Sequence, residues 1–142
     1  MRITSNFDSG NIEILEASSP DNIKLAIRKD NQSDFYQWFH FRLSSPHNQV
    51  HKLTITNAGD SAYPDGWKDY QAVASYDRQT WFRVETDYDG KELTITHYPE
   101  ADSVYFAYFA PYSYERHLDL LSNAQLHPDV NLEHLGLTLD GR

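Results

Sequence analysis

Short runs in which apolar and polar residues alternate dominate the first 110 positions of the chain. In the run 23–27, Ile or Leu occupies every second position, with Lys24 and Ala26 between them. Because a β-strand sends successive side chains to opposite faces, this pattern predicts a strand with one buried face. Similar runs occur at Ile12/Ile14, Leu53/Ile55, Val73/Ser75, Phe82/Val84, Leu93/Ile95 and Val104/Phe106/Tyr108. We therefore predict about nine strands.

Turn-forming residues separate these runs. Clusters rich in Gly, Pro, Asp, Asn and Ser lie at 8–10, 19–22, 44–46, 64–66 and 88–91. Such residues reverse the chain, either through positive φ or through the fixed φ of proline. Since no helical pattern intervenes before position 111, the sequence predicts an all-β, mainly antiparallel fold, a β-sandwich of about nine strands.

Two of the predicted strands carry bulky residues on both faces. In the run 35–43, Phe39 and Phe41 alternate with Trp38 and His40, and the segment 105–109 has aromatic rings at most of its positions. A strand that is apolar on both faces needs cover on both. We expect the first strand to lie inside a sheet, and the second to be covered either by this domain or by another one.

The pattern changes after Pro111. Four residues there fall at the spacing i, i+3, i+4, i+7 that is typical of one helix face: Tyr114, His117, Leu118 and Leu121. Ser113 is a suitable N-cap, and Glu115 in the first turn suits the helix dipole. We predict a short helix near 113–122, ended before Pro128, and one more strand at 135–139.

Charge and composition exclude several function classes. The 21 acidic residues outnumber the 12 basic ones, which gives a net charge of −9, and no cysteine is present. An acidic chain without a Lys/Arg block is poorly suited to nucleic acid or to an anionic membrane surface. No apolar run approaches the roughly 20 residues of a membrane span, and no apolar stretch follows Met1 as in a signal peptide. We expect a cytoplasmic protein that binds neither nucleic acid nor membrane.

The motifs of common active sites are weak or missing. His97 and Glu100 match the His-x-x-Glu pattern of some zinc peptidases, but strand periodicity sends the two side chains to opposite faces. The seven histidines are scattered, without the spacing of a helical metal site. No Gly-rich phosphate loop and no Gly-x-Ser-x-Gly elbow is present. We predict no catalytic residue and no metal ligand in this chain.

An aromatic-rich segment leaves one alternative open. Tyr63, Trp67 and Tyr70 lie within eight residues of each other. Exposed rings on a β-sandwich can stack on sugars, so the chain could be a free-standing carbohydrate- or ligand-binding module. Rings that cover the core are the more common outcome, and exposure or burial of Trp67 distinguishes the two interpretations.

Several longer segments of the sequence form a recognisable set of motifs. They are Ser5–Ile12, Gln37–Arg42, Asn57–Ala58, Tyr63–Trp67, Ser75–Asp77, Trp81–Val84 and Tyr105–His117. The last reads Tyr-Phe-Ala-Tyr-Phe-Ala-Pro-Tyr-Ser-Tyr-Glu-Arg-His and is the most specific. In this order, and over nearly the whole chain, the sequence resembles the N-terminal domain of the cytosolic carboxypeptidases, a branch of the zinc metallocarboxypeptidases.

The resemblance implies a parent enzyme with two domains. Residues 1–131 correspond to the N-terminal β-sandwich domain, and residues 132–142 to a connector and the first strand of a catalytic domain. Zinc, its ligands and the catalytic residues of the family belong to that second domain, so no cofactor is expected in this chain. The implied partners are this C-terminal carboxypeptidase domain and, for the parent, the C-terminal tails of peptides or proteins.

The resemblance and the double-sided strand together suggest where the catalytic domain would contact this one. We expect the strand and helix start between 105 and 117 to face it. The candidate interface or substrate-funnel residues are Tyr112, Tyr114, Arg116 and His117, with Arg116 suited to pairing with a carboxylate.

Overall fold

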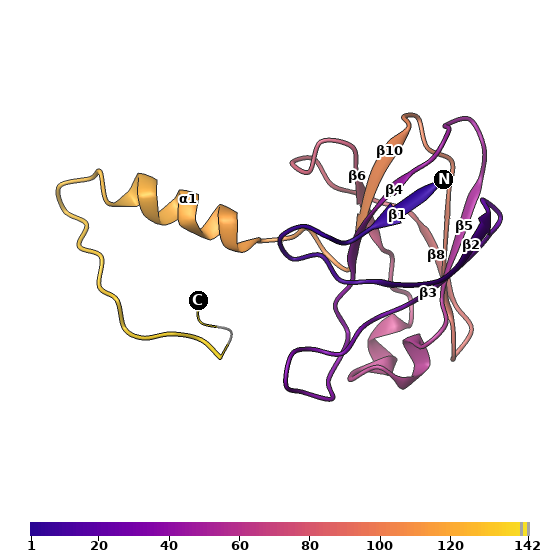
Figure 1. Ribbon diagram of the computed structural model, residues 1–142, viewed down its shortest axis with the longest axis horizontal. Coiled ribbons are helices and arrows are strands. Elements are labelled where there is room, and N and C mark those ends of the chain that lie inside the picture. Colours follow the sequence, from indigo (N-terminus) through magenta and orange to yellow (C-terminus); the bar gives the residue numbers. More distant parts are fainter. Residues whose placement is uncertain (140, 142) are drawn as a thin grey trace. The chain divides into compact units, whose positions relative to one another are not determined.

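Two five-stranded sheets pack face to face in the computed structural model, which describes residues 1–139 and 141. Sheet A has the order β1 (Arg2–Thr4), β4 (His40–Ser44), β10 (Ser103–Ala107), β6 (Val73–Ser75) and β7 (Phe82–Arg83). Sheet B has the order β2 (Glu13–Ser19), β3 (Asn22–Ala26), β5 (His51–Ile55), β9 (Leu93–His97) and β8 (Glu85–Tyr88). All neighbouring strands are antiparallel except β3 and β5 (Figure 1). The predicted all-β sandwich is confirmed.

The core lies between the two sheets and is built from the apolar faces of the alternating strands. Leu25 of β3, Leu53 of β5 and Ile95 of β9 are fully buried on the inner side of sheet B. Phe41 of β4 and Phe106 of β10 are fully buried on the inner side of sheet A, with ring centroids 5.4 Å apart. The period-two pattern of the sequence therefore becomes the two facing layers of the core.

Strand boundaries differ from the predicted ones at two places. Residues 35–39 are not a strand, so β4 begins only at His40 and lies between β1 and β10, inside sheet A. The run predicted at Phe82/Val84 ends at buried Val84, because β7 pairs in sheet A, whereas β8, which was not predicted, follows at once and pairs in sheet B. The short β1, with three residues, was not predicted.

A tight loop between β1 and β2 lies against the outer side of sheet A. The Gly10 N–H donates to the carbonyl of Phe7, and the Asn11 N–H donates to the carbonyl of His40. A Cβ atom at position 10 would lie 2.0 Å from the carbonyl oxygen of Ser5, a backbone atom that cannot turn away. Glycine is therefore required for this loop to close.

We expect Gly10→Ala to lower the free energy of unfolding by about 1–3 kcal/mol, because the loop must open to admit the methyl group. Urea unfolding followed by tryptophan fluorescence measures the change. The control is Asn6→Ala in the same loop, since the Asn6 side chain is exposed and should change stability by less than about 0.5 kcal/mol. Equal stability of Gly10→Ala and the unmodified protein would contradict this description of the loop.

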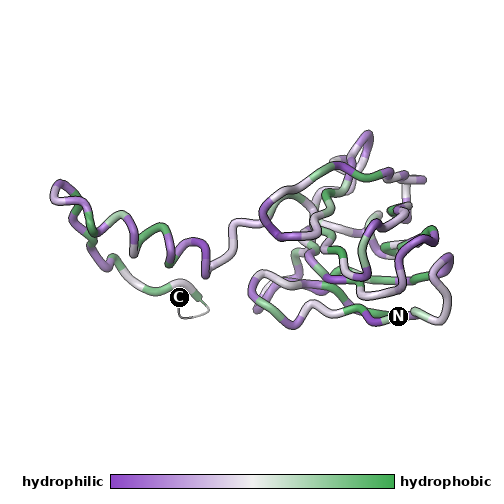
Figure 2. Tube along the Cα trace, turned by 90° about the horizontal axis from the view of Figure 1, so that it is seen from above, coloured by the Kyte–Doolittle hydropathy of each residue, from purple (hydrophilic) through white to green (hydrophobic). Residues whose placement is uncertain are grey.

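Residues Tyr112–Arg142 form a compact unit separate from Met1–Pro111. This second unit contains α1 (Tyr114–Ala124), so the helix predicted near 113–122 is confirmed and ends two residues later. Figure 2 shows polar and apolar residues alternating along α1 and the segment after it. No helix among the described residues is long and apolar enough to span a membrane.

The segment after α1 contains no helix or strand between 125 and 139. The strand predicted at 135–139 is therefore not formed, since a strand needs a hydrogen-bonded neighbour and none pairs with these residues. Leu135, Leu137 and Leu139 are exposed. Asp140 and Arg142, which close the predicted segment 132–142, lie outside the described residues. The assignment of 132–142 to a second domain stays a prediction.

Candidate functional site

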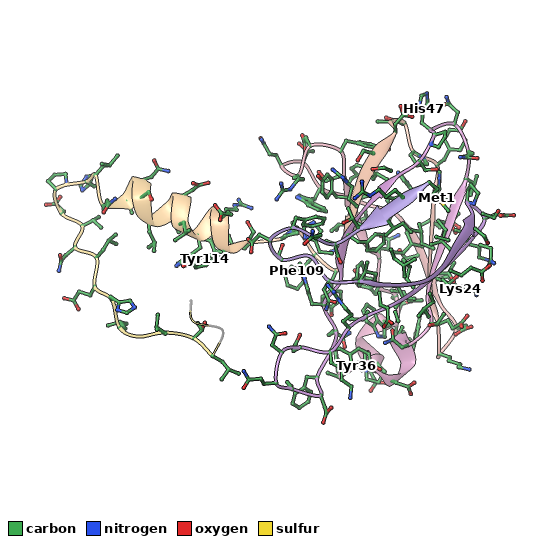
Figure 3. The ribbon with its side chains drawn as sticks, viewed as in Figure 1. Met1, Lys24, Tyr36, His47, Phe109 and Tyr114 are labelled. Atoms are coloured by element: carbon green, nitrogen blue, oxygen red, sulfur yellow. The ribbon has the colours of Figure 1, made fainter. Side chains whose placement is uncertain are left out.

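Aromatic side chains gather on the outer side of sheet A around a buried histidine. His40 of β4 is only 2% exposed, because neighbouring rings cover it. Ring centroids of Phe7 and Trp81 lie 4.9 and 5.7 Å from that of His40, both edge-on. Trp38 lies 6.1 Å from His40 and 5.0 Å from Phe109, which is exposed and follows β10 (Figure 3). We call Phe7, Trp38, His40, Trp81, Tyr105 and Phe109 the outer-face cluster.

Hydrogen bonds to one serine fix the orientation of this cluster. The indole N–H of Trp38 donates to the carbonyl of Ser9 at 2.8 Å, and Ser9 Oγ lies 3.0 Å from His40 Nδ1. The other ring nitrogen of His40, Nε2, is buried without a hydrogen-bond partner. Burial, together with the positive charge of Arg78, lowers the pKa of His40 to about 4. His40 is therefore neutral at pH 7.

Arg78 covers the same cluster from the loop after β6. Its guanidinium carbon lies 5.6 Å from the ring centroid of Tyr105 and 6.0 Å from that of Phe7. Arg78 has a φ of 63°, and its backbone N–H donates to Ser75 Oγ at 2.8 Å. The turn thus directs a cation onto two aromatic faces, an arrangement that the ring quadrupole favours.

Sequence reasoning did not identify Phe7, Arg78 or Trp81 as members of a common cluster. The one available signal was the strand with bulky residues on both faces, which includes Trp38 and His40. Phe7, Arg78 and Trp81 lie in loops, which come together only through the pairing of β4, β10 and β6.

The four predicted interface residues come together at the start of α1. Ser113 caps the helix by accepting a hydrogen bond from the Arg116 N–H at 3.3 Å, as predicted. The His117 ring lies 6.2 Å from Tyr112 and 6.3 Å from Tyr114, and the Arg116 guanidinium lies 5.6 Å from the Tyr112 ring. We call Tyr112, Tyr114, Arg116 and His117 the helix-start cluster. Tyr114, Arg116 and His117 lie in the first turn of α1, and Tyr112 immediately precedes the N-cap.

Apolar residues of α1 are left uncovered. No residue of the helix is buried, and Leu118 and Leu120 are 37% and 56% exposed. An amphipathic helix normally gains its stability by burying an apolar face. In the second unit, the apolar face of α1 therefore lacks such cover among the described residues.

The structure overturns the sugar-platform alternative. Trp67, at the end of a 3-10 helix (Pro64–Trp67), is fully buried and stacks on Phe39 at 6.4 Å. The Tyr70 hydroxyl donates to the carbonyl of Tyr108, and Tyr63 is exposed, so the three rings do not form one open surface. The prediction of a carbohydrate platform at Tyr63, Trp67 and Tyr70 is wrong, because the Trp67 ring is buried in the core.

An open cleft of about 960 Å³ borders the same segment. It is lined by residues of 64–71 and 86–90, including Asp65, Asp69, Asp87 and Asp89 and one cation, Lys68. None of the described residues that line it is a histidine, serine or cysteine. Its four aspartates give the cleft a predominantly acidic lining.

His97 and Glu100 each form a hydrogen bond with the hydroxyl of Tyr76. The Tyr76 hydroxyl lies 3.1 Å from His97 Nε2 and accepts a hydrogen bond from the backbone N–H of Glu100 at 2.9 Å. Burial lowers the pKa of His97, as it does for buried His51 on the paired strand β5. Across 1–139 and 141, no three His, Asp or Glu side chains are grouped as a metal site.

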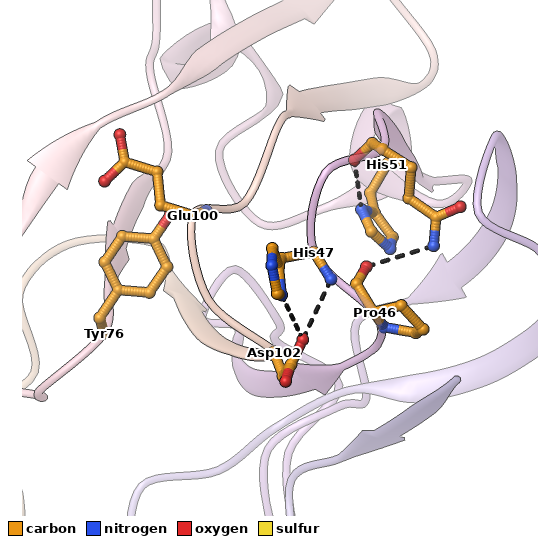
Figure 4. Close-up of polar contacts among 7 residues, drawn as sticks. Pro46, His47, His51, Tyr76, Glu100 and Asp102 are labelled. Carbon is orange, nitrogen blue, oxygen red and sulfur yellow. Dashed lines mark hydrogen bonds and ion pairs between the residues drawn. The ribbon is translucent and has the colours of Figure 1, made fainter.

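The remaining polar contacts in this region join loops at one end of the sandwich. His47 Nδ1 lies 2.6 Å from Asp102 Oδ1, and the His47 backbone N–H donates to the same oxygen at 3.2 Å (Figure 4). His51 Nδ1–H donates to the carbonyl of Gln49 at 3.1 Å. The His47–Asp102 contacts connect the loop after β4 to the residue before β10, and the His51–Gln49 hydrogen bond holds that loop to the start of β5.

The architecture defines the class of this domain. It is a β-sandwich of two five-stranded sheets, followed by a short exposed helix. The family model described as cytosolic carboxypeptidase N-terminal domain matches residues 3–109, about three quarters of the chain. The chain belongs to this family, as the motifs from 5 to 117 predicted.

Solved structures share the fold over the whole chain. A putative carboxypeptidase A from Shewanella denitrificans is 58% identical, with a TM-score of 0.95, and the match covers 100% of this chain and 38% of that one. A metallo-carboxypeptidase from Pseudomonas aeruginosa, solved with (2-guanidinoethylmercapto)succinic acid, is 46% identical with the same TM-score and the same coverage.

Curated relatives agree with this assignment. An uncharacterized protein of Zymomonas mobilis is 50% identical over all 142 residues, which is 37% of its own length. Cytosolic carboxypeptidase 1 of Xenopus laevis is 29% identical over 80% of this chain and 12% of that protein. The chain thus spans well under half the length of the relatives that it matches.

Proposed function

We propose that this chain serves as the non-catalytic N-terminal domain of a zinc metallocarboxypeptidase, which removes C-terminal amino acids from peptides or proteins. The observation that carries the proposal is coverage: the match to solved carboxypeptidases covers 99–100% of this chain but only 37–38% of those chains. In this proposal zinc and its ligands belong to the remaining part of the enzyme. The cytosolic description of the family supports a cytoplasmic location.

The domain's proposed role is to shape substrate access and to support folding of the catalytic domain. The helix-start cluster supports this role, because it combines two tyrosines and an arginine, the residue types enriched at energetically important interface positions. The exposed leucines of α1 and of 132–139 support it as well, since a partner domain would bury them. In this proposal residues 132–142 are the connector and first strand of that partner.

The test uses the full-length protein and two variants. We expect full-length protein to release C-terminal residues from peptides and to lose that activity when a chelator removes zinc. We expect the double variant Tyr112→Ala/Arg116→Ala to lower kcat/KM by about tenfold or more, because two interface anchors are lost. Mass spectrometry of the released amino acids provides the rate.

The control variant is Lys52→Ala, an exposed residue of β5 in the other unit, which should retain full activity. Thermal unfolding of each variant separates a loss of domain docking, seen as an earlier transition, from a change in substrate access, seen as a higher KM alone. Absence of zinc-dependent peptidase activity in the full-length protein would overturn the proposal. Unchanged activity and unfolding in the double variant would overturn the role of the helix-start cluster.

A further inference from the structure

Two histidines face each other inside one end of the sandwich. Strand register pairs His51, the first residue of β5, with His97, the last residue of β9. His51 is two residues from buried Leu53, and His97 is two residues from buried Ile95, so both histidine side chains point to the inner side of sheet B. The His97 ring lies 5.6 Å from that of Phe106 in sheet A. The histidine pair therefore lies between the two sheets.

Two loops close this end of the sandwich over the histidine pair. We call residues 45–50, between β4 and β5, and residues 98–102, between β9 and β10, the end latch. The Ser45 N–H donates to the carbonyl of Asp102 at 3.0 Å, and His47 contacts the Asp102 carboxylate across the same two loops (Figure 4). His47 and Asp102 are exposed, and hydrogen bonds near solvent open more easily than those inside a sheet.

One tyrosine connects the end latch to the histidine pair. The Tyr76 hydroxyl accepts a hydrogen bond from the Glu100 N–H at 2.9 Å and lies 3.1 Å from His97 Nε2. The hydroxyl can donate its own proton to His97 only while Nε2 carries none. The hydrogen bonds that hold residues 98–102 therefore favour the neutral form of His97.

His51 favours its neutral form for a different reason. Its Nδ1–H donates to the carbonyl of Gln49 at 3.1 Å, whereas Nε2 is buried and, among the described residues, has no hydrogen-bond partner. A proton on Nε2 would place a charge in the core without an acceptor. Ser45 Oγ, in the end latch, is also buried without a partner in the described part of the chain. Water that enters through an open latch would satisfy both atoms, and this lowers the cost of opening.

The charges nearest the histidine pair add little to offset this preference. Burial lowers the pKa of His51, and the positive Met1 amino group lowers it further. Burial also lowers the pKa of His97; a charged His51 adds to this effect, and the Glu100 carboxylate opposes it. The groups that sheet A and its loops place against His97 are three aromatic rings, those of Tyr76, Phe82 and Phe106. The closed end thus binds a proton more weakly than an exposed histidine does.

We propose that the end latch is a pH-sensitive device, which opens when the histidine pair binds a proton and closes when the proton leaves. Opening gives the charged ring access to water, while the paired strands on either side stay folded. Because the open form binds the proton more tightly than the closed form, falling pH shifts the equilibrium toward the open form. This shift begins below 6.5, the ordinary pKa of histidine. The inference does not depend on the proposed peptidase.

Hydrogen exchange of the full chain, followed by NMR from about pH 7 to about pH 4.5, tests the proposal. The result is expressed as protection factors, which correct for the pH dependence of intrinsic exchange. We expect protection of the Ser45, His47 and Glu100 amides to fall by about tenfold or more, in step with the NMR titration of His51 and His97. The amides of β5 and β9 should remain at least about tenfold better protected at each pH.

A double variant that cannot take up the proton should keep the end latch closed. Asparagine at position 51 retains a donor for the Gln49 carbonyl, and glutamine at position 97 retains an acceptor for the Tyr76 hydroxyl. We therefore expect His51→Asn/His97→Gln to hold its latch protection within about twofold over the same pH range. Tyr76→Phe should lower protection of the Glu100 amide by about tenfold even at about pH 7, because the acceptor of that amide is lost.

His40→Asn and His47→Gln are the matched controls, since each removes one imidazole that lies outside the histidine pair. Both should open the end latch with the same pH dependence as the unmodified protein. The Asp102 carboxylate stays charged over this range, because its contact with His47 lowers its pKa. An undiminished loss of latch protection in the double variant, or no loss in His47→Gln, would overturn the proposal. Should the double variant not fold, constant latch protection in the unmodified protein while His51 and His97 titrate would overturn it equally.

Discussion

Replacing Trp67 by alanine is expected to lower the free energy of unfolding by about 3–5 kcal/mol, a large fraction of the stability of a domain this size. The indole ring is fully buried and contacts Phe39, Tyr70 and Tyr108, at centroid distances of 6.4, 5.1 and 5.3 Å. Alanine would leave a cavity that these rings can fill only in part. Equilibrium unfolding in urea, followed by circular dichroism, gives the change.

A second substitution separates packing from hydrogen bonding at the same position. The Trp67 indole N–H donates to the carbonyl of Ala58 at 2.9 Å and to Ser61 Oγ at 2.8 Å. Trp67→Phe keeps most of the ring but leaves both acceptors unpaired, so we expect a smaller loss of about 1–3 kcal/mol. Tyr63→Ala, at an exposed ring nearby, is the control and should change stability little. A loss below that of the control in Trp67→Ala would contradict the assignment of Trp67 to the core.

Sequence periodicity predicted the sandwich, because apolar and polar residues alternate along the strands that form each inner face. Ile23, Leu25 and Ile27 are all buried, as their spacing indicates. The pattern could not predict where strands end, because pairing with a neighbour decides that. Phe39 is buried and continues the alternation of β4, yet it precedes the strand. Val84 likewise continues an alternation, although the chain changes sheets there.

The aromatic residues illustrate why the candidate sites were only partly predictable. Tyr114 and His117 are three residues apart in the predicted helix, so they lie on the same helix face, and their spacing alone predicts the contact. Arg42, Arg78 and Tyr105 are far apart in sequence and meet only through the pairing of β4 with β10 and of β10 with β6. A single sequence contains no local signal for such a meeting. Trp67 gave an ambiguous signal because an indole suits both a sugar platform and a core.

The second large effect is a dependence of folding stability on pH, which originates at His40. Its pKa in the folded protein is about 4, against an ordinary value of 6.5, because burial and Arg78 disfavour the charged ring. Below pH 6.5 the unfolded chain therefore binds a proton that the folded chain rejects, so stability falls as pH falls. We expect a loss of about 2–3 kcal/mol between about pH 7 and about pH 4 from this residue. Urea unfolding at a series of pH values measures it.

His40→Asn isolates that contribution, because asparagine does not titrate. The variant should be less stable at neutral pH, since packing is lost, but its stability should decline less steeply toward pH 4. Some decline should persist, because burial also lowers the pKa values of His51 and His97. Asp77 acts in a different range: its pKa, lowered to about 2 from 3.8, removes stability only as pH falls through that lower interval. Parallel stability curves for the variant and the unmodified protein above about pH 4 would show that His40 is not held neutral by the outer-face cluster.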